Sequence, residues 1–409
     1  MRLTASILFL LLVSLGNLSL AQPDSLGTWI TSFPSLPTDR QESSTTELNG
    51  EIYIMGGIPL AVFIEDVVEV YNPSSNSWKT VSSLPGARHH QATAAANGKL
   101  YLFGGYNDIT FIDKDDTYVY DPLTDIWTSL APMPTSRGAM ASVEFGQKIY
   151  VIGGDNNTGA LNTNEVYDPS TDTWTTMVPM PTPREHHAAA VVGSLIYVVG
   201  GRGTTGASTK LEAYDPAINA WTTLTDMPTG RGGLAAIGLH GKLYVFGGEG
   251  GGIHGETEMY DPITDTWQTL EPLPTPRHGM GAVAIGDTIY VIGGATVEGF
   301  GPTDVSEAFI PPTSITAINE QQSPGVFDLT HYHSGNNQVR IQFSLPRNSR
   351  LEAVVLNIAG QVQATLLDEV VNSGEHTVVF ATDHLPSGVY FYSFRTATSA
   401  VTRKFVVVE

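Results

Sequence analysis

Side chains that could do chemistry stand at one recurring place in this sequence, directly after an arginine. Glu185, His186 and His187 follow Arg184 without a break. An imidazole beside a carboxylate can accept and donate protons near neutral pH. These three residues are therefore the candidate catalytic groups, acting as acid or base, although no residue of the chain matches a catalytic motif specifically.

Further histidines occupy the same place elsewhere in the chain. His89 and His90 follow Arg88, and His278 follows Arg277. A zinc or copper site would need three or more such nitrogens within about 2.1 Å of one point. Neighbouring sheets pack roughly 10 Å apart, so these side chains converge only if they meet in a narrow channel. We therefore expect these histidines to form a polar lining of the channel, with no metal and no cofactor. His89 and His278 are also candidates for ligand binding.

The arginine belongs to a repeated unit that fills most of the chain. The other marks of the unit are a tryptophan and a Gly-Gly pair that ends an apolar run. Each mark occurs six times, and the Gly pairs begin at residues 56, 104, 153, 200, 247 and 293. Every arginine precedes its Gly pair by 16 residues, whereas the stretch after the pair varies in length. Insertions are thus confined to one place in the unit.

Each unit reads as four short strands. The first follows the arginine and is rich in small residues, as in 188–192, and the second ends in the Gly pair, as in 148–154. The third ends in Tyr-Asp-Pro, as in 166–169, and the fourth opens with tryptophan, as in 173–176. Four-stranded sheets repeated around an axis form a propeller. The small residues of the first strand suit the crowding near that axis.

Residues 149–154 (Ile-Tyr-Val-Ile-Gly-Gly) and 165–174 (Glu-Val-Tyr-Asp-Pro-Ser-Thr-Asp-Thr-Trp) resemble the kelch repeat. The resemblance implies an all-β fold with a six-bladed kelch-type propeller over residues 22–312. The last unit stops without a tryptophan strand, and the chain opens with an unpaired one around Trp29. We expect this N-terminal strand to complete the sixth blade and close the ring, which hides the edges of the sheets.

In such a propeller the arginines and the variable stretches share one face, and loops of variable length are where function tends to lie. A guanidinium binds a carboxylate or sulfate through paired hydrogen bonds, so a ring of arginines predicts a ligand with an acidic group. In protein-binding kelch propellers, which this chain resembles, arginines at these positions contact acidic segments. The candidate ligand-binding arginines are Arg40, Arg88, Arg137, Arg184, Arg231 and Arg277, together with Arg202.

A structural role for the repeated arginines is the alternative. One arginine in every unit is also what bracing of a neighbouring blade through backbone carbonyls would require. Arg202 lies directly after a Gly pair and breaks the repetition. It is therefore the better functional candidate of the seven.

The segment over residues 324–409 lacks these marks and alternates as a small Ig-like β-sandwich, after a linker at 313–323. Five of its stretches resemble a type IX secretion C-terminal sorting domain of the type A form. They are Phe343–Pro346, Asn357–Gln361, Gly374–His376, Leu385–Phe391 and Lys404–Val408. The resemblance implies the type IX secretion machinery as a partner and an outer-membrane secretion route found in Bacteroidota.

Residues 1–21 read as a signal peptide. Arg2 gives a positive start, residues 7–15 are almost wholly apolar, and small residues precede a cleavage site after Ala21. The apolar run is too short to cross a bilayer, and no later stretch could do so. We expect a protein that is exported through the periplasm and is secreted or held at the outer cell surface.

Composition narrows the chemistry further. The formal net charge is −21, which disfavours nucleic acid and anionic membranes as partners. The chain has no cysteine, so disulfides, thiolate metal sites and a cysteine nucleophile are excluded. The missing cysteine also disfavours galactose-oxidase-like copper chemistry, which needs a Tyr–Cys crosslink.

Two functions from different classes remain open. The first is a binding module that holds a glycan or a protein on its loop face without turnover. The second is a sugar-acid mutarotase or epimerase, by analogy with exported six-bladed propellers of the sialic-acid mutarotase type. Arg and Glu/His groups at the channel mouth would suit acid–base ring opening.

Overall fold

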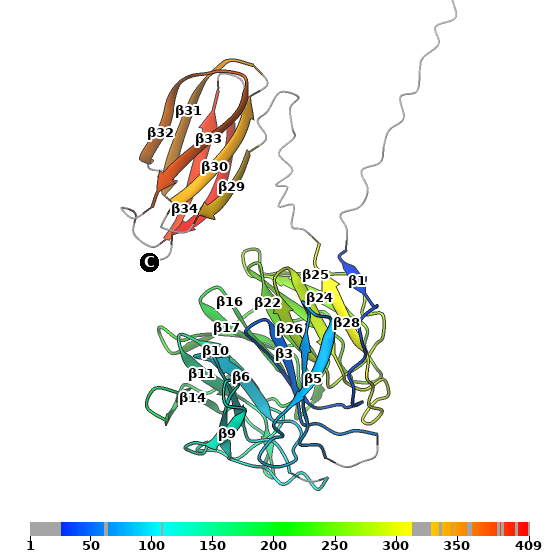
Figure 1. Cartoon of the computed structure of the whole chain (residues 1–409). Coiled ribbons are helices and arrows are strands. Elements are labelled where there is room, and N and C mark those ends of the chain that lie inside the picture. The colour runs from blue at the N-terminus through cyan, green and yellow to red at the C-terminus, as the bar shows by residue number, and fades with distance from the viewer. Residues whose placement is uncertain are drawn as a thin grey trace, which may run out of the picture. The chain divides into compact units, whose positions relative to one another are not determined.

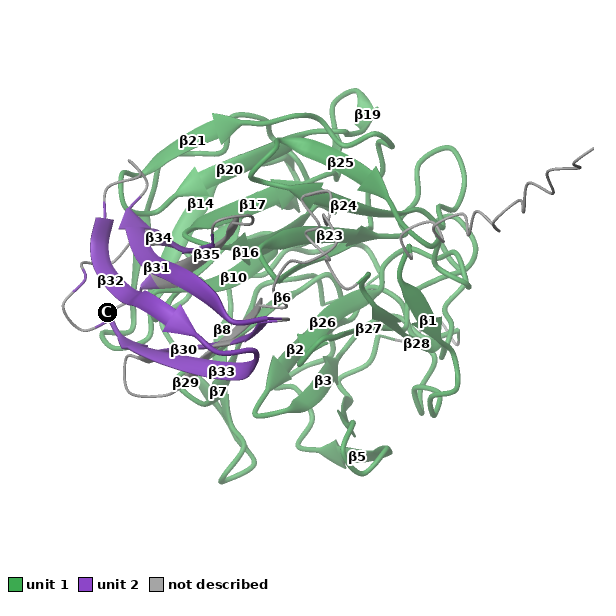
Figure 2. Cartoon of the chain, turned by 90° about the horizontal axis from the view of Figure 1, so that it is seen from above, with its two compact units in different colours: residues 1–313 green, residues 314–409 purple. Residues whose placement is uncertain are grey.

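The computed structural model describes two compact units within residues 1–313 and 314–409, respectively (Figures 1 and 2). The described residues are 26–60, 64–107, 109–312, 329–334, 338–345, 347–357, 362–382, 385, 388–396 and 400–407. They contain strands and no helix, which confirms the all-β class. The signal peptide at 1–21 and the linker at 313–323 lie outside the described residues. The described residues therefore include no helix that could cross a membrane.

The first unit consists of six antiparallel four-stranded sheets, the blades. Blade 1 contains β2 (Ser44–Leu48), β3 (Glu51–Met55), β4 (Val68–Asn72) and β5 (Ser77–Val81). Blade 2 contains β6 (Ala92–Ala96), β7 (Lys99–Phe103), β8 (Thr117–Asp121) and β9 (Ile126–Ser129). Blade 3 contains β10 (Ala141–Phe145), β11 (Lys148–Ile152), β14 (Asn164–Asp168) and β15 (Thr173–Thr176). The order of strands in each sheet follows the chain.

Blades 4 and 5 repeat this pattern. Blade 4 contains β16 (Ala188–Val192), β17 (Leu195–Val199), β20 (Leu211–Asp215) and β21 (Ala220–Thr223). Blade 5 contains β22 (Ala235–Leu239), β23 (Lys242–Phe246), β24 (Thr257–Asp261) and β25 (Thr266–Thr269). Two short hairpins lie in the variable stretches after Gly pairs: β12 (Asp155–Asn156) with β13 (Gly159–Ala160), and β18 (Arg202–Gly203) with β19 (Gly206–Ala207).

Blade 6 joins the two ends of the unit. It contains β26 (Gly281–Ile285), β27 (Thr288–Ile292), β28 (Ser306–Ile310) and the N-terminal strand β1 (Thr28–Ile30). Trp29 lies opposite Phe309 in the β1–β28 pair, and its indole donates a hydrogen bond to the carbonyl of Glu271 in the connection after blade 5. The other five tryptophans donate in the same way to a carbonyl in the connection that follows the preceding blade. The predicted closure by the N-terminal strand is confirmed.

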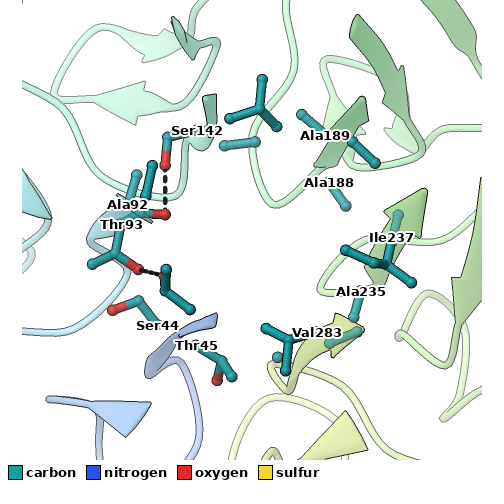
Figure 3. A pocket seen from close by; sticks show the side chains of 18 of the residues that line it. Ser44, Thr45, Ala92, Thr93, Ser142, Ala188, Ala189, Ala235, Ile237 and Val283 are labelled. Carbon is teal, nitrogen blue, oxygen red and sulfur yellow. Dashed lines mark hydrogen bonds between the residues drawn. The ribbon is translucent and has the colours of Figure 1, made fainter. Parts of the chain in front are cut away.

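The innermost strands form a complete ring around a channel. β2 contacts β6 and β26, and the contacts continue through β10, β16 and β22 without a gap. The channel encloses a volume of about 590 Å³, and small side chains such as those of Ala92, Ala188 and Ala235 line it (Figure 3). Thr46 and Thr93 share a hydrogen bond of 2.6 Å across two blades. Small residues are needed here because six backbones approach one axis.

The Gly pairs tie each blade to the next. In blade 2 the amide of Gly105 donates to the carbonyl of Arg137, which opens blade 3. A Cβ on the preceding Gly104, whose φ is +49°, would lie 2.5 Å from that same carbonyl oxygen. The first glycine therefore lacks a side chain for two reasons, the left-handed backbone and the approach of the neighbouring blade.

The second unit is a β-sandwich. One sheet has the order β29-β30-β33, and the other has the order β32-β31-β34-β35. Their bounds are β29 (Leu329–Ser334), β30 (Gln338–Leu345), β31 (Ser349–Asn357), β32 (Val362–Val371), β33 (Gly374–Ala381), β34 (Gly388–Arg395) and β35 (Ala400–Val407). Buried side chains of both sheets, including Ile341, Val355 and Phe394, form its core.

Candidate functional site

The repeat arginines are buried inside the blades. Five of them have 0% exposure and form ion pairs of 2.5–2.8 Å with buried glutamates of their own blade's third strand. The pairs are Arg40–Glu69, Arg137–Glu165, Arg184–Glu212, Arg231–Glu258 and Arg277–Glu307. Arg88 has a tyrosine at the equivalent place and lies over the ring of Tyr118, 5.3 Å from its centroid. These guanidinium groups are enclosed within their own blades and do not form a ligand-binding surface.

This burial corrects the expectation of an arginine ring at the channel mouth. The physical reason is that each guanidinium finds its acceptors within one blade. Arg137, for example, donates to the carbonyl of Val151 in β11 and to the carboxylate of Glu165 in β14. The alternative of a bracing role describes the geometry better, although the carbonyls belong to the arginine's own blade rather than to a neighbour.

Two residues after each arginine, the chain forms a closed ring, which we call the neck. Each member donates its backbone N–H to the carbonyl of the member in the preceding blade, and the sixth bond returns to the first blade. Every member has a positive φ between 50° and 62°. The members are Glu42, His90, Ala139, His186, Gly233 and Gly279. Six hydrogen bonds thus hold three polar side chains at fixed positions around the axis.

Those three polar side chains meet. The Nε2 atoms of His90 and His186 are 2.9 Å apart, and His90 Nε2 lies 3.4 Å from a carboxylate oxygen of Glu42. One ligand atom from each of the three residues lies within 4.8 Å of the others. The neck thus brings together side chains of blades 1, 2 and 4. The spacing of neighbouring sheets had predicted that these side chains would stay apart.

A second layer of charge lies above the neck. Arg202 donates to Glu185 and to Glu249, with both distances 3.0 Å. Arg202 lies one residue after a Gly pair, as Glu249 does in the next blade, and the backbone of each pairs with the residue that follows an arginine. Glu185 and Glu249 thus share one guanidinium, and Glu42 of the neck adds a third carboxylate that lines the same pocket as Arg202.

The histidines of the neck carry no charge at neutral pH. Burial lowers the pKa of His90 to about 3, with Arg202 and His278 acting in the same direction. Burial also lowers the pKa of His186 well below its ordinary value, and the neighbouring imidazoles and Arg202 act in the same direction. With both imidazoles neutral, the site as a whole is negative.

A pocket of about 360 Å³ opens above the neck, and we call it the mouth pocket. Glu42, His90 and His186 line its floor, and they also line a smaller cavity of about 120 Å³ that leads toward the channel. The rim carries Phe111 and Phe300, which are 52% and 40% exposed. The neck thus separates the mouth from the channel.

Both aromatic groups of the rim are held by contacts with the site. The Phe111 ring centroid lies 5.1 Å from that of His89 and 5.8 Å from that of His90. The loop that carries Phe300 is fixed on both sides, because Gly299 donates to Glu249 and its carbonyl accepts from Gln41. The rim therefore offers apolar surface at defined positions.

Comparison with known proteins places these features in a family. A family model described as the Kelch motif matches residues 39–85 and 87–134, and one described as the KLHDC2/KLHL20/DRC7 Kelch-repeats domain matches 131–294. The chain is a kelch-repeat protein. A model described as the secretion system C-terminal sorting domain matches residues 335–408, so the sandwich of this kelch protein is its type IX sorting domain.

A solved structure supports the fold of the kelch unit. The structure titled "Structure of YjhT" matches with a TM-score of 0.59 at 17% sequence identity, and the match covers 67% of this chain and 95% of that one. At this identity the likeness shows the fold alone. No curated protein matches the kelch protein described here.

Only some of the candidate residues predicted from the sequence lie at the mouth pocket. Arg202, His89 and His186 line the mouth pocket, and Glu185 contacts His186 Nδ1 behind it. His187 faces away, because its Nε2 lies 3.0 Å from the carbonyl of Ile152 in the adjacent blade.

Another candidate, His278, is almost fully buried. It lies between Glu249, at 3.5 Å, and Glu42, at 3.9 Å. It therefore stands behind the carboxylates of the site rather than on the surface of the mouth pocket.

Sequence reasoning missed several residues of the mouth pocket, among them Glu42, Glu249, Phe111 and Phe300. A signal existed for two of them, since Glu42 follows an arginine by two positions, as His90 does, and Glu249 follows a Gly pair, as Arg202 does. Phe111 and Phe300 lie in stretches of variable length, where the repeat gives no register. Only the face on which they lie could be expected.

Proposed function

We propose that this secreted kelch propeller is a binding protein that holds a segment of another protein in its mouth pocket. The observation that carries the proposal is the apolar rim above a fixed polar floor. Besides Phe111 and Phe300, the exposed side chains of Ile109, Ile112 and Val297 belong to loops after Gly pairs. Apolar side chains gathered beside a pocket are typical of interaction sites.

Charge favours an uncharged or basic group in the ligand over an acidic one. Arg202 is already paired with Glu185 and Glu249, so an acidic group would have to displace one of them. Three carboxylates against one guanidinium leave the floor with a net charge of −2, in a place where partial burial reduces screening. These charges therefore do not favour the acidic ligand group that the arginines predicted from the sequence.

The same arrangement weakens the alternative of a sugar-acid mutarotase. The carboxylate of a sugar acid would enter beside Glu42 and Glu249, and the only guanidinium that lines the described part of the pocket is the paired Arg202. We therefore place binding without turnover ahead of catalysis by Glu185 and His186.

Export follows from the sorting domain, which indicates secretion or display at the cell surface. We propose that the signal at residues 1–21 first takes the chain into the periplasm. The type IX machinery then recognises the C-terminal domain and moves the propeller outside, where its mouth pocket meets a partner.

Replacing Phe111 with serine is expected to weaken binding of a protein ligand at least tenfold, because a central aromatic anchor often contributes about 2 kcal/mol. The full chain would be screened against purified extracellular proteins and against a glycan array. Affinities of the wild type and of the variants for a binder would then be measured by biolayer interferometry.

Leu123→Ser is the matched control for Phe111→Ser. Leu123 is 94% exposed and lies in the turn between β8 and β9, on the opposite face of the same blade. Its replacement should leave affinity unchanged. Equal losses for the two variants, or a response from glycans alone, would refute a protein ligand at the mouth pocket.

A further inference from the structure

The geometry points to a binding site for one divalent transition-metal ion, with zinc the best match, formed by Glu42, His90 and His186 at the neck. This inference rests on the neck itself and not on the proposed ligand. Two imidazoles and one carboxylate are one of the usual sets of three protein ligands around a zinc ion with one open position.

The separations suit a tetrahedral ion. Ligand atoms that are 2.0–2.1 Å from a zinc ion at tetrahedral angles lie roughly 3.4 Å from one another. His90 Nε2 lies 3.4 Å from the Glu42 carboxylate and 2.9 Å from His186 Nε2. Small rotations of the side chains would open the shorter separation, while the backbone ring keeps its place.

The tautomer of His186 leaves a lone pair directed into the site. The carboxylate of Glu185 contacts His186 Nδ1, and an ionised carboxylate only accepts hydrogen bonds. A proton on Nδ1 would face this acceptor, and Nε2, which faces His90, would then be the unprotonated nitrogen. A carboxylate behind a histidine is also the arrangement that orients imidazole ligands in metal sites.

His90 can take the same tautomer. Its Nδ1 contacts Nδ1 of His89, so a proton on His90 Nδ1 has an acceptor there. Without a metal, a proton on His90 Nε2 fills the space between the two imidazoles. A metal ion would take the place of that proton, and the two Nε2 lone pairs would both become ligands.

Charge gives a second, independent reason for a cation. Glu42, Glu185 and Glu249 are 12%, 17% and 7% exposed, and Arg202 is their one cationic partner in the described part of the pocket. A divalent ion would bring the net charge of this group from −2 to zero. Partial burial makes that gain larger than it would be on an open surface.

The donor set selects among cations. Calcium and magnesium prefer oxygen ligands, and two of the three donors here are imidazole nitrogens. Zinc, copper and nickel accept such a set. All three ligands line both the mouth pocket and the smaller cavity beneath it, so the fourth position of a tetrahedral ion would be reached from one of these two spaces.

The test is zinc binding by the full chain after treatment with a chelator, measured by isothermal titration calorimetry. We expect one zinc per chain at micromolar affinity or tighter, and no response to magnesium. His186→Ala and Glu42→Gln should each weaken zinc binding at least tenfold. Glu185→Gln should weaken it 10- to 100-fold through the orientation of His186.

Two controls keep the result interpretable. His240→Ala removes an exposed histidine in the turn between β22 and β23 and should leave zinc affinity unchanged. Phe111→Ser should keep zinc while losing the protein ligand, so the two proposals can fail separately. Circular dichroism confirms that each variant is folded. Absence of zinc binding by the wild type, or equal binding by folded His186→Ala and Glu42→Gln variants, overturns the inference.

Discussion

Replacing Arg137 with methionine is expected to lower the free energy of unfolding of the propeller by about 3–5 kcal/mol. The guanidinium is fully buried and pairs with Glu165, so its loss leaves a buried carboxylate without a counter-charge. Urea unfolding followed by tryptophan fluorescence measures the change. The signal reports on the propeller alone, because all six tryptophans precede residue 268.

Two variants separate the ion pair from general damage to the core. Arg137→Met combined with Glu165→Leu should recover much of the loss, since a buried pair replaced by apolar groups is often close to neutral. Arg88→Met should cost less than Arg137→Met, because Asp116, the partner of Arg88, is 38% exposed. A cost of about 1 kcal/mol or less for Arg137→Met would contradict the account of the arginines as internal braces.

Replacing Gly104 with alanine is expected to destabilise the propeller by about 2–5 kcal/mol. The left-handed backbone alone disfavours any Cβ, and this Cβ would lie 2.5 Å from the carbonyl oxygen of Arg137 and 2.8 Å from that of Lys114. Both obstacles are backbone atoms, and one belongs to the next blade. Chemical denaturation followed by fluorescence again gives the change.

Gly98→Ala isolates the steric part of this effect. Gly98 has a φ of +73°, and a Cβ there would meet nothing within 4 Å. Its replacement should cost only the backbone strain, about 1–2 kcal/mol. Equal costs for Gly98→Ala and Gly104→Ala would mean that the Gly pair is required for its conformation and not for the contact between blades.

The repeat made the fold predictable. Six copies of one spacing define four strands each, and the unpaired strand around Trp29 supplies the one that the last unit lacks. The burial of the arginine side chains inside their own blades was harder to foresee. A sequence signal for their burial did exist, because a glutamate stands two positions before the tyrosine in blades 1, 3, 4 and 5, and Tyr118 replaces it in blade 2.

The site was predictable only in part. His186 and Arg202 were found from their places beside an arginine and a Gly pair. The convergence of His90 with His186 was not expected, because the spacing of sheets keeps the blades apart over most of their length. The neck overcomes this spacing, since the backbone turns inward with positive φ and hydrogen-bonds from blade to blade. No single repeat encodes that closed ring.

Hydrogen–deuterium exchange of the full chain, with and without a captured protein ligand, tests the binding role of the mouth pocket most directly. The account predicts slower exchange in residues 109–115 and 296–302, which carry the rim, and unchanged exchange in the turns at 121–126 and 215–220 on the opposite face. Protection of those turns, with the rim residues unaffected, would contradict it.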